Sequence, residues 1–443
     1  MAIGVGLLGL GTVGAGVAAI LMGPEGRHPL VAELALRRVA VRDLDRPRPL
    51  ELDPQLLTTS PEAVIDDPAV EIVVEVMGGL EPARSLILRA IAAGKPVVTA
   101  NKAVIARYGE EIAAAAAERG VYVLIEAAVG GGIPIIEPLK QSLGGNRIQR
   151  VSGIINGTTN YILSRMADEG AAYGDVLADA QRLGYAEADP AADVQGGDAA
   201  DKIAILAGLA YGGPVARAGI ATEGIDRLDA RDVAYAAQLG FVVKLVATAE
   251  RVGDGLEGPG EAIPLDVRVH PTLLPKHHPL AGVHGVNNAI LVEGDPVGQV
   301  MFYGPGAGAG PTASAVVADI LNIAGIRRAT GSQAGARLDP LLAASSWRRC
   351  TLVDGSGTSH RNYVRLQTRD EAGVIGRIGT CFGDAGVSIQ SIVQFEAREG
   401  EAGGGAEIVV ITHEVRESAF RSALAAIEAL EEVRTVAACL RTL

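Results

Sequence analysis

The sequence predicts an α/β protein whose first domain is built on a doubly wound parallel sheet. Apolar segments with strand character alternate with helical segments over residues 1–128, an order that is typical of parallel sheets. A chain of 443 residues is too long for one ordinary hydrophobic core, so two or three domains are expected. From residue 361 the order of elements changes to βαββαβ, which predicts a separate α+β domain.

The composition argues against several classes of partner. The net charge of −13 disfavours nucleic acid, because phosphate backbones bind to basic surfaces. The three cysteines are scattered, which fits reduced thiols in the cytoplasm and neither a disulfide framework nor a zinc site. Residues 1–22 carry no charge, but their six glycines and the lack of a preceding basic residue argue against a membrane span or a signal peptide.

The first predicted strand, residues 3–8, runs directly into a glycine-rich loop and then a helix at 15–21. This strand–GxGxxG–helix order is the context of a Rossmann-type dinucleotide site. The first glycine permits a tight turn, the second lets the backbone approach a pyrophosphate, and the third lets helix and strand pack closely. A glycine-rich packing turn is the alternative. The candidate cofactor residues here are Gly9, Gly11, Thr12, Val13 and Gly14.

The second predicted strand, residues 34–41, ends in Arg42 and Asp43, where the adenosine ribose of a dinucleotide is expected. An acidic residue at this position prefers the 2′-hydroxyl of NAD, whereas an arginine favours the 2′-phosphate of NADP. Because the two residues are adjacent, the residues alone leave both cofactors open.

Three more strands are predicted at residues 70–76, 96–99 and 121–125, with helices between them. Ligands of such sheets bind at the carboxyl ends of the strands. Polar residues at these ends are Glu75, Asn101, Lys102 and Glu126. Lys102 is either an active-site lysine or a surface lysine that opens a helix, and its apolar neighbours favour the active site.

The densest group of candidate catalytic residues lies within residues 180–202. The apolar run at 203–210 predicts a largely buried helix, with Asp198 and Lys202 on its first turn. Side chains four residues apart share one face of a helix, so this carboxylate and this ammonium group can pair. A lysine and several carboxylates at the entry to a buried helix indicate proton transfer and the binding of an ammonium group.

This stretch resembles the signature of the homoserine dehydrogenase family. The matching positions are Ala180, Gly184, Tyr185, Ala186, Asp189, Pro190, Asp193, Val194, Gly196, Asp198 and Lys202. Other segments resemble the family in the same order along the chain, namely the first glycine-rich loop and residues 99–102, 126–134, 156–160 and 303–314. The resemblance covers nearly the whole chain and implies a monofunctional homoserine dehydrogenase. Such enzymes interconvert L-aspartate 4-semialdehyde and L-homoserine with NAD(P)(H), on the route to threonine, methionine and isoleucine.

The resemblance implies a role for each candidate residue. Lys202 would donate a proton to the substrate oxygen, with Lys102 as its partner and Asp198 positioning Lys202 or the substrate hydroxyl. Two converging ammonium groups are expected to lower each other's pKa. Glu187 would accept the substrate's α-ammonium group, and Asp193 and Lys102 would also bind substrate. Beyond the first glycine-rich loop, the cofactor contacts would come from Arg42, Lys102, Gly184 and Gly308.

The resemblance also bears on the cofactor and on a metal ion. Arg42 matches the arginine with which the family contacts the 2′-phosphate, so NADP is expected in preference to NAD. The segment after the last predicted strand resembles the family's site for a monovalent cation, Na⁺ or K⁺. Its ligands would be the carboxylate of Glu126 and the backbone carbonyls of Val129, Gly131 and Ile133. The same glycines also fit a flexible hinge between domains, and both can hold.

The expected domains follow from these assignments. Residues 1–128 form the NAD(P)-binding Rossmann domain, and the second glycine-rich loop returns the chain to it so that about 305–330 complete it; a plain linker is the alternative. Residues 129–304 form an α+β domain for substrate binding and dimerisation. Residues 331–360 form a linker to the last domain, 361–443.

Residues 361–443 resemble an ACT domain, whose usual role is to bind an amino acid where two such domains meet. Threonine is the effector that the resemblance implies, and a homodimer or homotetramer is the expected assembly. A purely oligomerising module is the alternative.

Two rival functions stay open. A non-catalytic sensor of NADP and amino acids would be expected to lack Lys102 or Lys202, and both are present. A related oxidoreductase for another amino-acid semialdehyde is disfavoured by the signature within 180–202, but its pocket cannot be sized from sequence.

Overall fold

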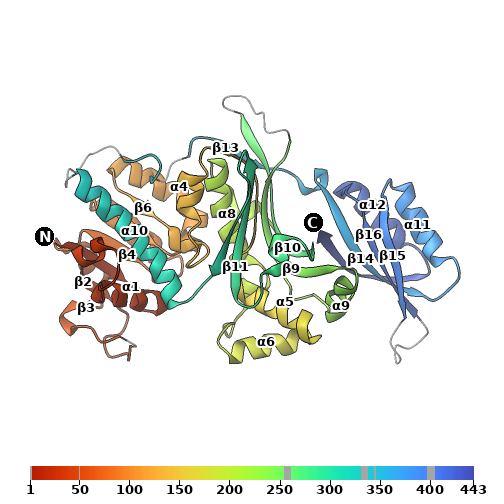
Figure 1. The fold of residues 1–443 in the computed structure, drawn as a ribbon, viewed down its shortest axis with the longest axis horizontal. Helices are drawn as coiled ribbons and strands as arrows, with labels where there is room; N and C mark the ends of the chain where they lie inside the picture. Colours follow the sequence, from red (N-terminus) through yellow and green to blue (C-terminus); the bar gives the residue numbers. More distant parts are fainter. Residues whose placement is uncertain (1, 49, 254–260, 331–337, 344–345, 397–404) are drawn as a thin grey trace.

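The computed structural model describes residues 2–443 except for 49, 254–260, 331–337, 344–345 and 397–404. Its described parts form an elongated molecule with three regions in a row (Figure 1). The N-terminal domain lies at one end, a sheet-rich middle region follows, and the C-terminal domain lies at the other end. The predicted fold class, a doubly wound parallel sheet followed by two α+β regions, is confirmed.

The N-terminal domain contains a six-stranded parallel sheet with the order β3-β2-β1-β4-β5-β6. Its strands are β1 (Ile3–Leu8), β2 (Leu34–Ala40), β3 (Leu57–Thr58), β4 (Ile72–Glu75), β5 (Val97–Thr99) and β6 (Val123–Leu124). The strand order reverses between β1 and β4, and ligands of such sheets bind at this reversal. The sequence does not predict β3, because a strand of two residues leaves no periodic pattern.

Helices cover both faces of this sheet. One apolar cluster joins it to α2 (Pro61–Ile65), α3 (Ala83–Ala92) and α4 (Lys102–Arg119). Another joins it to α1 (Thr12–Met22) and to α10 (Ala309–Thr330), which arrives from far along the chain. A Cβ at Gly16 would lie 2.6 Å from the carbonyl oxygen of Ala309, so α1 and α10 approach closely. By length and composition α10 could span a membrane, but half of its apolar stretch is buried in the protein.

The middle region contains antiparallel strands in the order β12-β11-β7-β9-β10. These strands are β7 (Arg147–Ile154), β9 (Phe241–Arg251), β10 (Ala262–Pro275), β11 (Asn287–Asp295) and β12 (Gly298–Pro305). The pairing expected for the two apolar runs within β9 and β10 is present. The helices are α5 (Gly157–Glu169), α6 (Tyr173–Arg182), α7 (Ala191–Val194), α8 (Gly197–Tyr211) and α9 (Ala230–Gln238). Two short strands, β8 (Ala221–Thr222) and β13 (Arg349–Leu352), pair with β10, so the expected linker contains a strand.

The C-terminal domain has the predicted βαββαβ order, with one short extra strand. Its elements are β14 (Ser359–Arg369), α11 (Val374–Asp384), β15 (Ile389–Glu396), β16 (Gly405–Thr412), β17 (Val415–Arg416), α12 (Glu417–Glu428) and β18 (Val433–Thr442). Apolar side chains of α11 and α12 pack with those of the sheet in one cluster. Because β18 pairs in parallel with β10, the sheets of the middle region and the C-terminal domain are continuous.

Candidate functional site

The glycines of the loop between β1 and α1 differ in whether close packing or open space surrounds them. A Cβ at Gly9, which has a φ of +109°, would lie 2.9 Å from the carbonyl oxygen of Val76. A Cβ at Gly14 would lie 2.2 Å from the carbonyl oxygen of Gly9. A Cβ at Gly11 would meet nothing within 4 Å. Packing therefore requires Gly9 and Gly14, whereas Gly11 leaves room for a ligand to approach the backbone.

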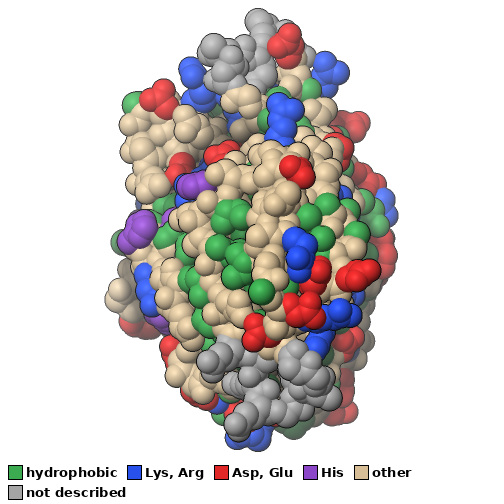
Figure 2. All heavy atoms as spheres, turned by 90° about the vertical axis from the view of Figure 1, so that its right-hand side faces the viewer, with side chains coloured by type: hydrophobic (Ala, Val, Ile, Leu, Met, Phe, Trp, Pro, Cys, Tyr) green, Lys and Arg blue, Asp and Glu red, His purple; other side chains and the backbone are tan. Residues whose placement is uncertain are grey.

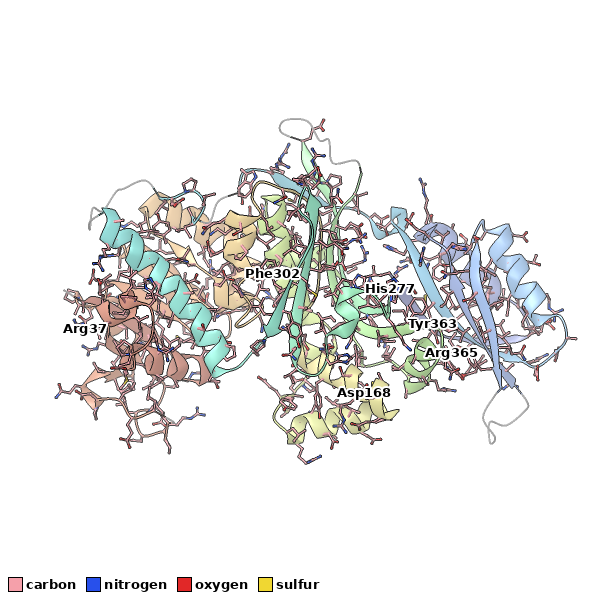
Figure 3. All side chains as sticks on the ribbon, in the orientation of Figure 1. Arg37, Asp168, His277, Phe302, Tyr363 and Arg365 are labelled. Carbon is pink, nitrogen blue, oxygen red and sulfur yellow. The ribbon has the colours of Figure 1, made fainter. Side chains whose placement is uncertain are left out.

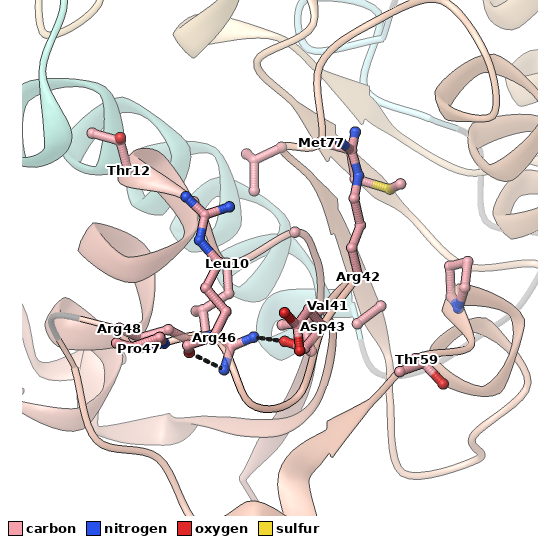
Figure 4. A pocket seen from close by; sticks show the side chains of 15 residues that line it. Leu10, Thr12, Val41, Arg42, Asp43, Arg46, Pro47, Arg48, Thr59 and Met77 are labelled. Carbon is pink, nitrogen blue, oxygen red and sulfur yellow. Dashed lines mark hydrogen bonds between the residues drawn. The ribbon is translucent and has the colours of Figure 1, made fainter.

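A pocket of about 570 Å³ opens beside this loop (Figure 4). Of the expected cofactor residues, Gly9, Gly11, Thr12 and Arg42 line it. The others, Val13, Gly14, Lys102, Gly184 and Gly308, do not line this pocket. Its size and its place at the ends of β1 and β2 fit the adenosine side of a dinucleotide.

Three arginines line the same pocket. Arg42 extends from the end of β2 toward Met77 (Figure 4) and forms no ion pair within the described part of the chain. Arg48 donates hydrogen bonds to the backbone carbonyls of Asp43, Leu44 and Arg46 and so folds the loop. One side-chain oxygen of Asp43 accepts the N–H of Asp45 at 2.9 Å. The sequence reasoning overlooked Arg46 and Arg48, although three arginines in seven residues were a visible sign.

Two lysines converge on one carboxylate at the start of α8. Asp198 Oδ1 lies 2.5 Å from the Nζ of Lys102, and its Oδ2 lies 2.7 Å from the Nζ of Lys202. Lys202 also donates to the carbonyl oxygen of Ile155 at 2.7 Å. The expected pairing across one turn of helix is therefore present, and Lys102 joins it from the first residue of α4, after β5.

An amide on the neighbouring helix connects this group to a second carboxylate. The Nδ2 of Asn156, the residue that caps α5, donates to Asp198 at 2.9 Å and to Asp193 at 2.7 Å. The hydroxyl of Thr158 lies 3.0 Å from the other oxygen of Asp193 and 2.8 Å from the carbonyl oxygen of Tyr185, and it can donate its one hydrogen to either. The sequence predicts Asn156 only as a helix cap, and its position between two candidate carboxylates is a tertiary feature.

The charges of these groups depend on burial and on each other. Burial lowers the pKa of Lys202, the charge of Asp198 opposes this, and the charge of Lys102 adds to it. Burial also acts to lower the pKa of Lys102, but Asp198 outweighs it and the pKa is raised. Burial acts to raise the pKa of Asp198, yet the two lysines hold that pKa well below its ordinary value. The expected lowering of the pKa is therefore present at Lys202 and wrong for Lys102, whose pKa is raised because burial is outweighed by Asp198, with Asp193 and Asp201 adding to its effect.

Within the described residues, no hydrogen bond or ion pair joins Glu187 or Gly184 to this cluster of charges. Both are exposed on the segment between α6 and α7. The carboxylate of Glu187 forms no hydrogen bond or ion pair within the described residues, and only its backbone oxygen accepts a bond, from Gln181 at 3.1 Å. Gly184 has a φ of +79° and terminates α6 in a turn that favours glycine.

Three carboxyl groups lie close together around Glu126, the first residue of the candidate cation segment. Glu126 accepts hydrogen bonds from the backbone N–H groups of Ile135, Ile136 and Glu137 at 2.6–2.9 Å. One candidate ligand oxygen from each of Glu126, Glu137 and Asp319 lies within 4.8 Å of the others. Asp319 is fully buried, and its Oδ1 has no hydrogen-bond partner within the described residues.

This arrangement fits a cation. Burial raises the pKa of both Glu126 and Asp319, as expected when carboxyl groups share a buried site without enough positive charge. The backbone at Gly131, with a φ of +57°, passes so close to Gly306 that a Cβ would lie 2.4 Å from its carbonyl oxygen. Close packing therefore also explains this glycine. The sequence reasoning did not find Asp319, which lies 193 residues from Glu126.

Comparisons with known proteins agree with these features. The family model described as the NAD-binding domain of homoserine dehydrogenase matches residues 9–126, and that described as homoserine dehydrogenase matches residues 134–321. A third model, for the ACT domain, matches residues 362–432. A homoserine dehydrogenase from Synechocystis sp. is 58% identical over the full length of both chains.

The chain belongs to the homoserine dehydrogenase family. It is thus an NAD(P)-dependent oxidoreductase with a C-terminal ACT domain. The crystal structure of a homoserine dehydrogenase from Thiobacillus denitrificans superposes with a TM-score of 0.86 at 43% identity, covering 100% of this chain and 98% of that one. A hyperthermophilic archaeal homoserine dehydrogenase in complex with NADPH has a TM-score of 0.60 at 29% identity, covering 74% of this chain and 98% of that one.

Proposed function

We propose that this homoserine dehydrogenase interconverts L-aspartate 4-semialdehyde and L-homoserine at the cluster of Lys102, Asp198 and Lys202. The observation that carries this proposal is the convergence of two ammonium groups on one buried carboxylate at the entry to α8. Reduction of an aldehyde to an alcohol needs one hydride at carbon and one proton at oxygen. When bound, the nicotinamide supplies the hydride, and the chain's own residues supply the proton.

Lys202 is the proposed proton donor. It is buried, its Nζ is held by Asp198 and by the carbonyl of Ile155, and burial lowers its pKa. A lysine with a lowered pKa releases its proton more readily near neutral pH. In the oxidative direction the neutral amine of Lys202 would take the proton back from the substrate hydroxyl.

Lys102 is the proposed electrostatic partner. Its raised pKa keeps it protonated, and its side chain is 39% exposed, so it faces the more open side of the cluster. A fixed positive charge beside the substrate oxygen stabilises the negative charge that develops there during hydride transfer. Asp198 holds both lysines in place and acts as a positioning residue.

The carboxylates of Asp193 and Glu187 are the proposed contacts for the substrate's α-ammonium group. Asp193 is already oriented by Asn156 and Thr158. Glu187 is exposed and unpaired within the described residues, so its carboxylate is available to a cationic group.

NADP is the proposed preferred cofactor. Arg42 and Arg46 line the pocket at the end of β2 and are exposed, whereas the carboxylate of Asp43 is engaged by the N–H of Asp45. Guanidinium groups pair well with a 2′-phosphate. The NADPH complex of the archaeal relative supports this choice.

Further proposals concern the cation, regulation, assembly and location. Na⁺ or K⁺ would be held near Glu126 by carboxylate and backbone oxygens, with Asp319 contributing negative charge.

The ACT domain would bind threonine and mediate feedback inhibition on the route to threonine, methionine and isoleucine. Hydrophobic side chains gather between charged ones on the outer end of that domain (Figure 2), which fits association into a homodimer or homotetramer. The enzyme would be cytoplasmic.

The first test is the initial rate of L-homoserine oxidation with NADP and with NAD, repeated with added L-threonine. Turnover that is faster with NADP and inhibited by threonine would support the reaction, the cofactor and the regulation together. Binding of cofactor without turnover would contradict the proposed reaction and favour a sensing protein. Faster reduction of a different amino-acid semialdehyde than of L-aspartate 4-semialdehyde would favour a related oxidoreductase with another substrate.

A further inference from the structure

A second pocket, of about 560 Å³, lies apart from the dehydrogenase site, and we call it the junction pocket. It is enclosed by η4 (Pro138–Ser142), the turn that leads into β7, the last turn of α8 and the segment before β13. It shares no lining residue with the pocket at the glycine-rich loop. Nothing in the proposed reaction uses it.

The charge of the junction pocket is opposite to that of the chain. Its lining includes four basic side chains and no acidic one, although the chain carries a net charge of −13. The basic residues are Lys140, Arg147, Arg251 and Arg348. Such a concentration of one sign in a concave surface attracts an anion.

Two of the four cations are available to a ligand. Arg147 and Arg348 are exposed, and their side chains form no ion pair within the described part of the chain. Lys140 is committed, because its Nζ donates to the carbonyl oxygen of Leu342 at 2.6 Å and lies 3.2 Å from Glu137. The two arginines come from different segments, and both line the pocket where an anion could pair with them.

A carbonyl oxygen at the C-terminal end of α8 is engaged by the segment before β13. A helix C-terminus carries partial negative charge, which by itself disfavours an anion. Here the carbonyl oxygen of Gly212, just beyond the helix, accepts N–H groups from both Trp347 and Arg348 at 2.9 Å. The hydroxyl of Tyr211, in the last turn of α8, lies 3.0 and 2.9 Å from the backbone carbonyl oxygens of Gln149 and Ala249 and can donate its one hydrogen to either. The two bonds to Gly212 therefore satisfy a carbonyl oxygen that would otherwise repel an anion at this end of the helix.

An exposed indole ring completes the pocket. Trp347 is the single tryptophan of the chain, and 63% of it is exposed. Its ring packs so closely on Gly212 that a Cβ at that position would lie 2.5 Å from an indole carbon. The ring is thus held at the pocket by a glycine contact while most of its surface remains open. A large aromatic ring beside cations is the arrangement that stacks a base next to a bound phosphate.

We propose that the junction pocket binds a nucleoside phosphate, with the phosphate between Arg147 and Arg348 and the base on Trp347. Guanidinium groups suit phosphate because they donate paired, charge-assisted hydrogen bonds. The ligand would join the segment before the ACT domain to the end of α8, the helix whose first turn carries Asp198 and Lys202. This site goes beyond the proposed reaction and does not depend on it.

The test uses the fluorescence of the full-length protein, because Trp347 is its only tryptophan. Adenosine monophosphate is titrated with excitation at the red edge of the indole band, and adenosine and inorganic phosphate are titrated separately. We expect saturable quenching by adenosine monophosphate, with weaker effects of either half alone. Arg147→Gln and Arg348→Gln should each weaken binding by about tenfold or more. Arg42→Gln, in the other pocket, should leave the quenching unchanged.

Several outcomes would overturn the proposal. Absence of saturable quenching at millimolar nucleotide would do so, as would quenching that survives both junction-pocket variants but is lost in Arg42→Gln. Equal binding of inorganic phosphate and adenosine monophosphate would contradict the role of the base.

Discussion

Arg365 on β14 forms a bidentate ion pair with Asp232 on α9, with bonds of 2.7 and 2.9 Å across the junction of the ACT domain and the middle region. Both side chains are almost completely buried. Arg365 also donates to Glu407 at 2.8 Å, and Tyr363 donates to Asp232 at 2.9 Å. Tyr363 and Arg365 lie where the C-terminal sheet meets the middle region (Figure 3). Together with the β10–β18 pairing, this network ties the ACT domain firmly to the catalytic part.

Removal of the buried guanidinium should strongly destabilise the protein. Arg365→Met leaves Asp232 buried without its counter-charge, although Glu407 stays paired with Arg231 at 3.0 Å. The free energy of unfolding should therefore fall by about 3 kcal/mol or more. Arg369→Met is the matched control, because Arg369 lies on the same strand and is 52% exposed. Its ion pair with Glu371 is long, at 4.0 Å, and is therefore expected to be weak. Its effect should stay within about 0.5 kcal/mol. Denaturant unfolding measures both, and equal stability of the two variants would contradict the importance of this ion pair.

Loss of Lys202 should abolish turnover without abolishing cofactor binding. Lys202→Ala removes the proposed proton donor, so kcat should fall by about a hundredfold or more. The dissociation constant of NADP should change little, because Lys202 is not among the lining residues of the cofactor pocket. Steady-state rates and a cofactor titration separate the two effects. Near-normal turnover would remove Lys202 from the mechanism.

Glu187→Gln should act mainly on substrate binding. If its carboxylate receives the α-ammonium group, loss of that charge should raise KM for homoserine by about tenfold or more and change kcat less. Asp189→Asn, on the same exposed segment, is the control and should change KM little. An unchanged KM in Glu187→Gln would identify the residue as a solvated loop carboxylate.

Arg42→Ser should change the choice of cofactor. KM for NADP should rise by about tenfold or more, whereas KM for NAD should stay within about twofold, because only NADP carries the 2′-phosphate. Arg37→Ser is the control, since Arg37 is exposed on β2, the strand that leads to Arg42, and does not line the pocket. Parallel rises in both KM values would mean that Arg42 contacts something other than the 2′-phosphate.

The buried Lys244 should make stability depend on alkaline pH. Burial lowers its pKa to about 8, and its Nζ is hydrogen-bonded to Asn160 and to the carbonyl of Val283 at 2.9 and 2.6 Å. Between pH 8 and the unfolded value of 10.5 the unfolded chain holds the proton and the folded protein releases it. Stability from this group therefore rises with pH across that window, by about 3 kcal/mol in total.

The comparison with Lys244→Met isolates this effect, because other groups titrate alike in both proteins. Unfolding free energies measured at pH 7 and at pH 10 should show the unaltered protein gaining stability relative to the variant as the pH rises. Below pH 8 Lys244 is protonated in both the folded and the unfolded state. The difference in unfolding free energy between the unaltered protein and Lys244→Met should therefore be constant there. Parallel stability curves for the two proteins across the whole range would contradict a lowered pKa at Lys244.

Local patterns predicted much of this protein. The GxGxxG loop after β1 and the alternation of strands and helices predict the parallel sheet, because such features span only neighbouring residues. The spacing of Asp198 and Lys202 predicts their pairing, because four residues form about one helical turn. The resemblance within residues 180–202 identified the family that the comparisons then showed.

The tertiary structure alone decided which distant groups meet. Asp319 lies 193 residues from Glu126, and Asp232 lies 133 residues from Arg365, yet each pair is hydrogen-bonded. The same holds for Lys102 and Asp198, where the shared carboxylate raises one lysine's pKa while burial lowers the other's. A local pattern carries no information about partners that packing brings together from separate elements. Burial and pairing, and therefore charge, were determined by the folded chain as a whole.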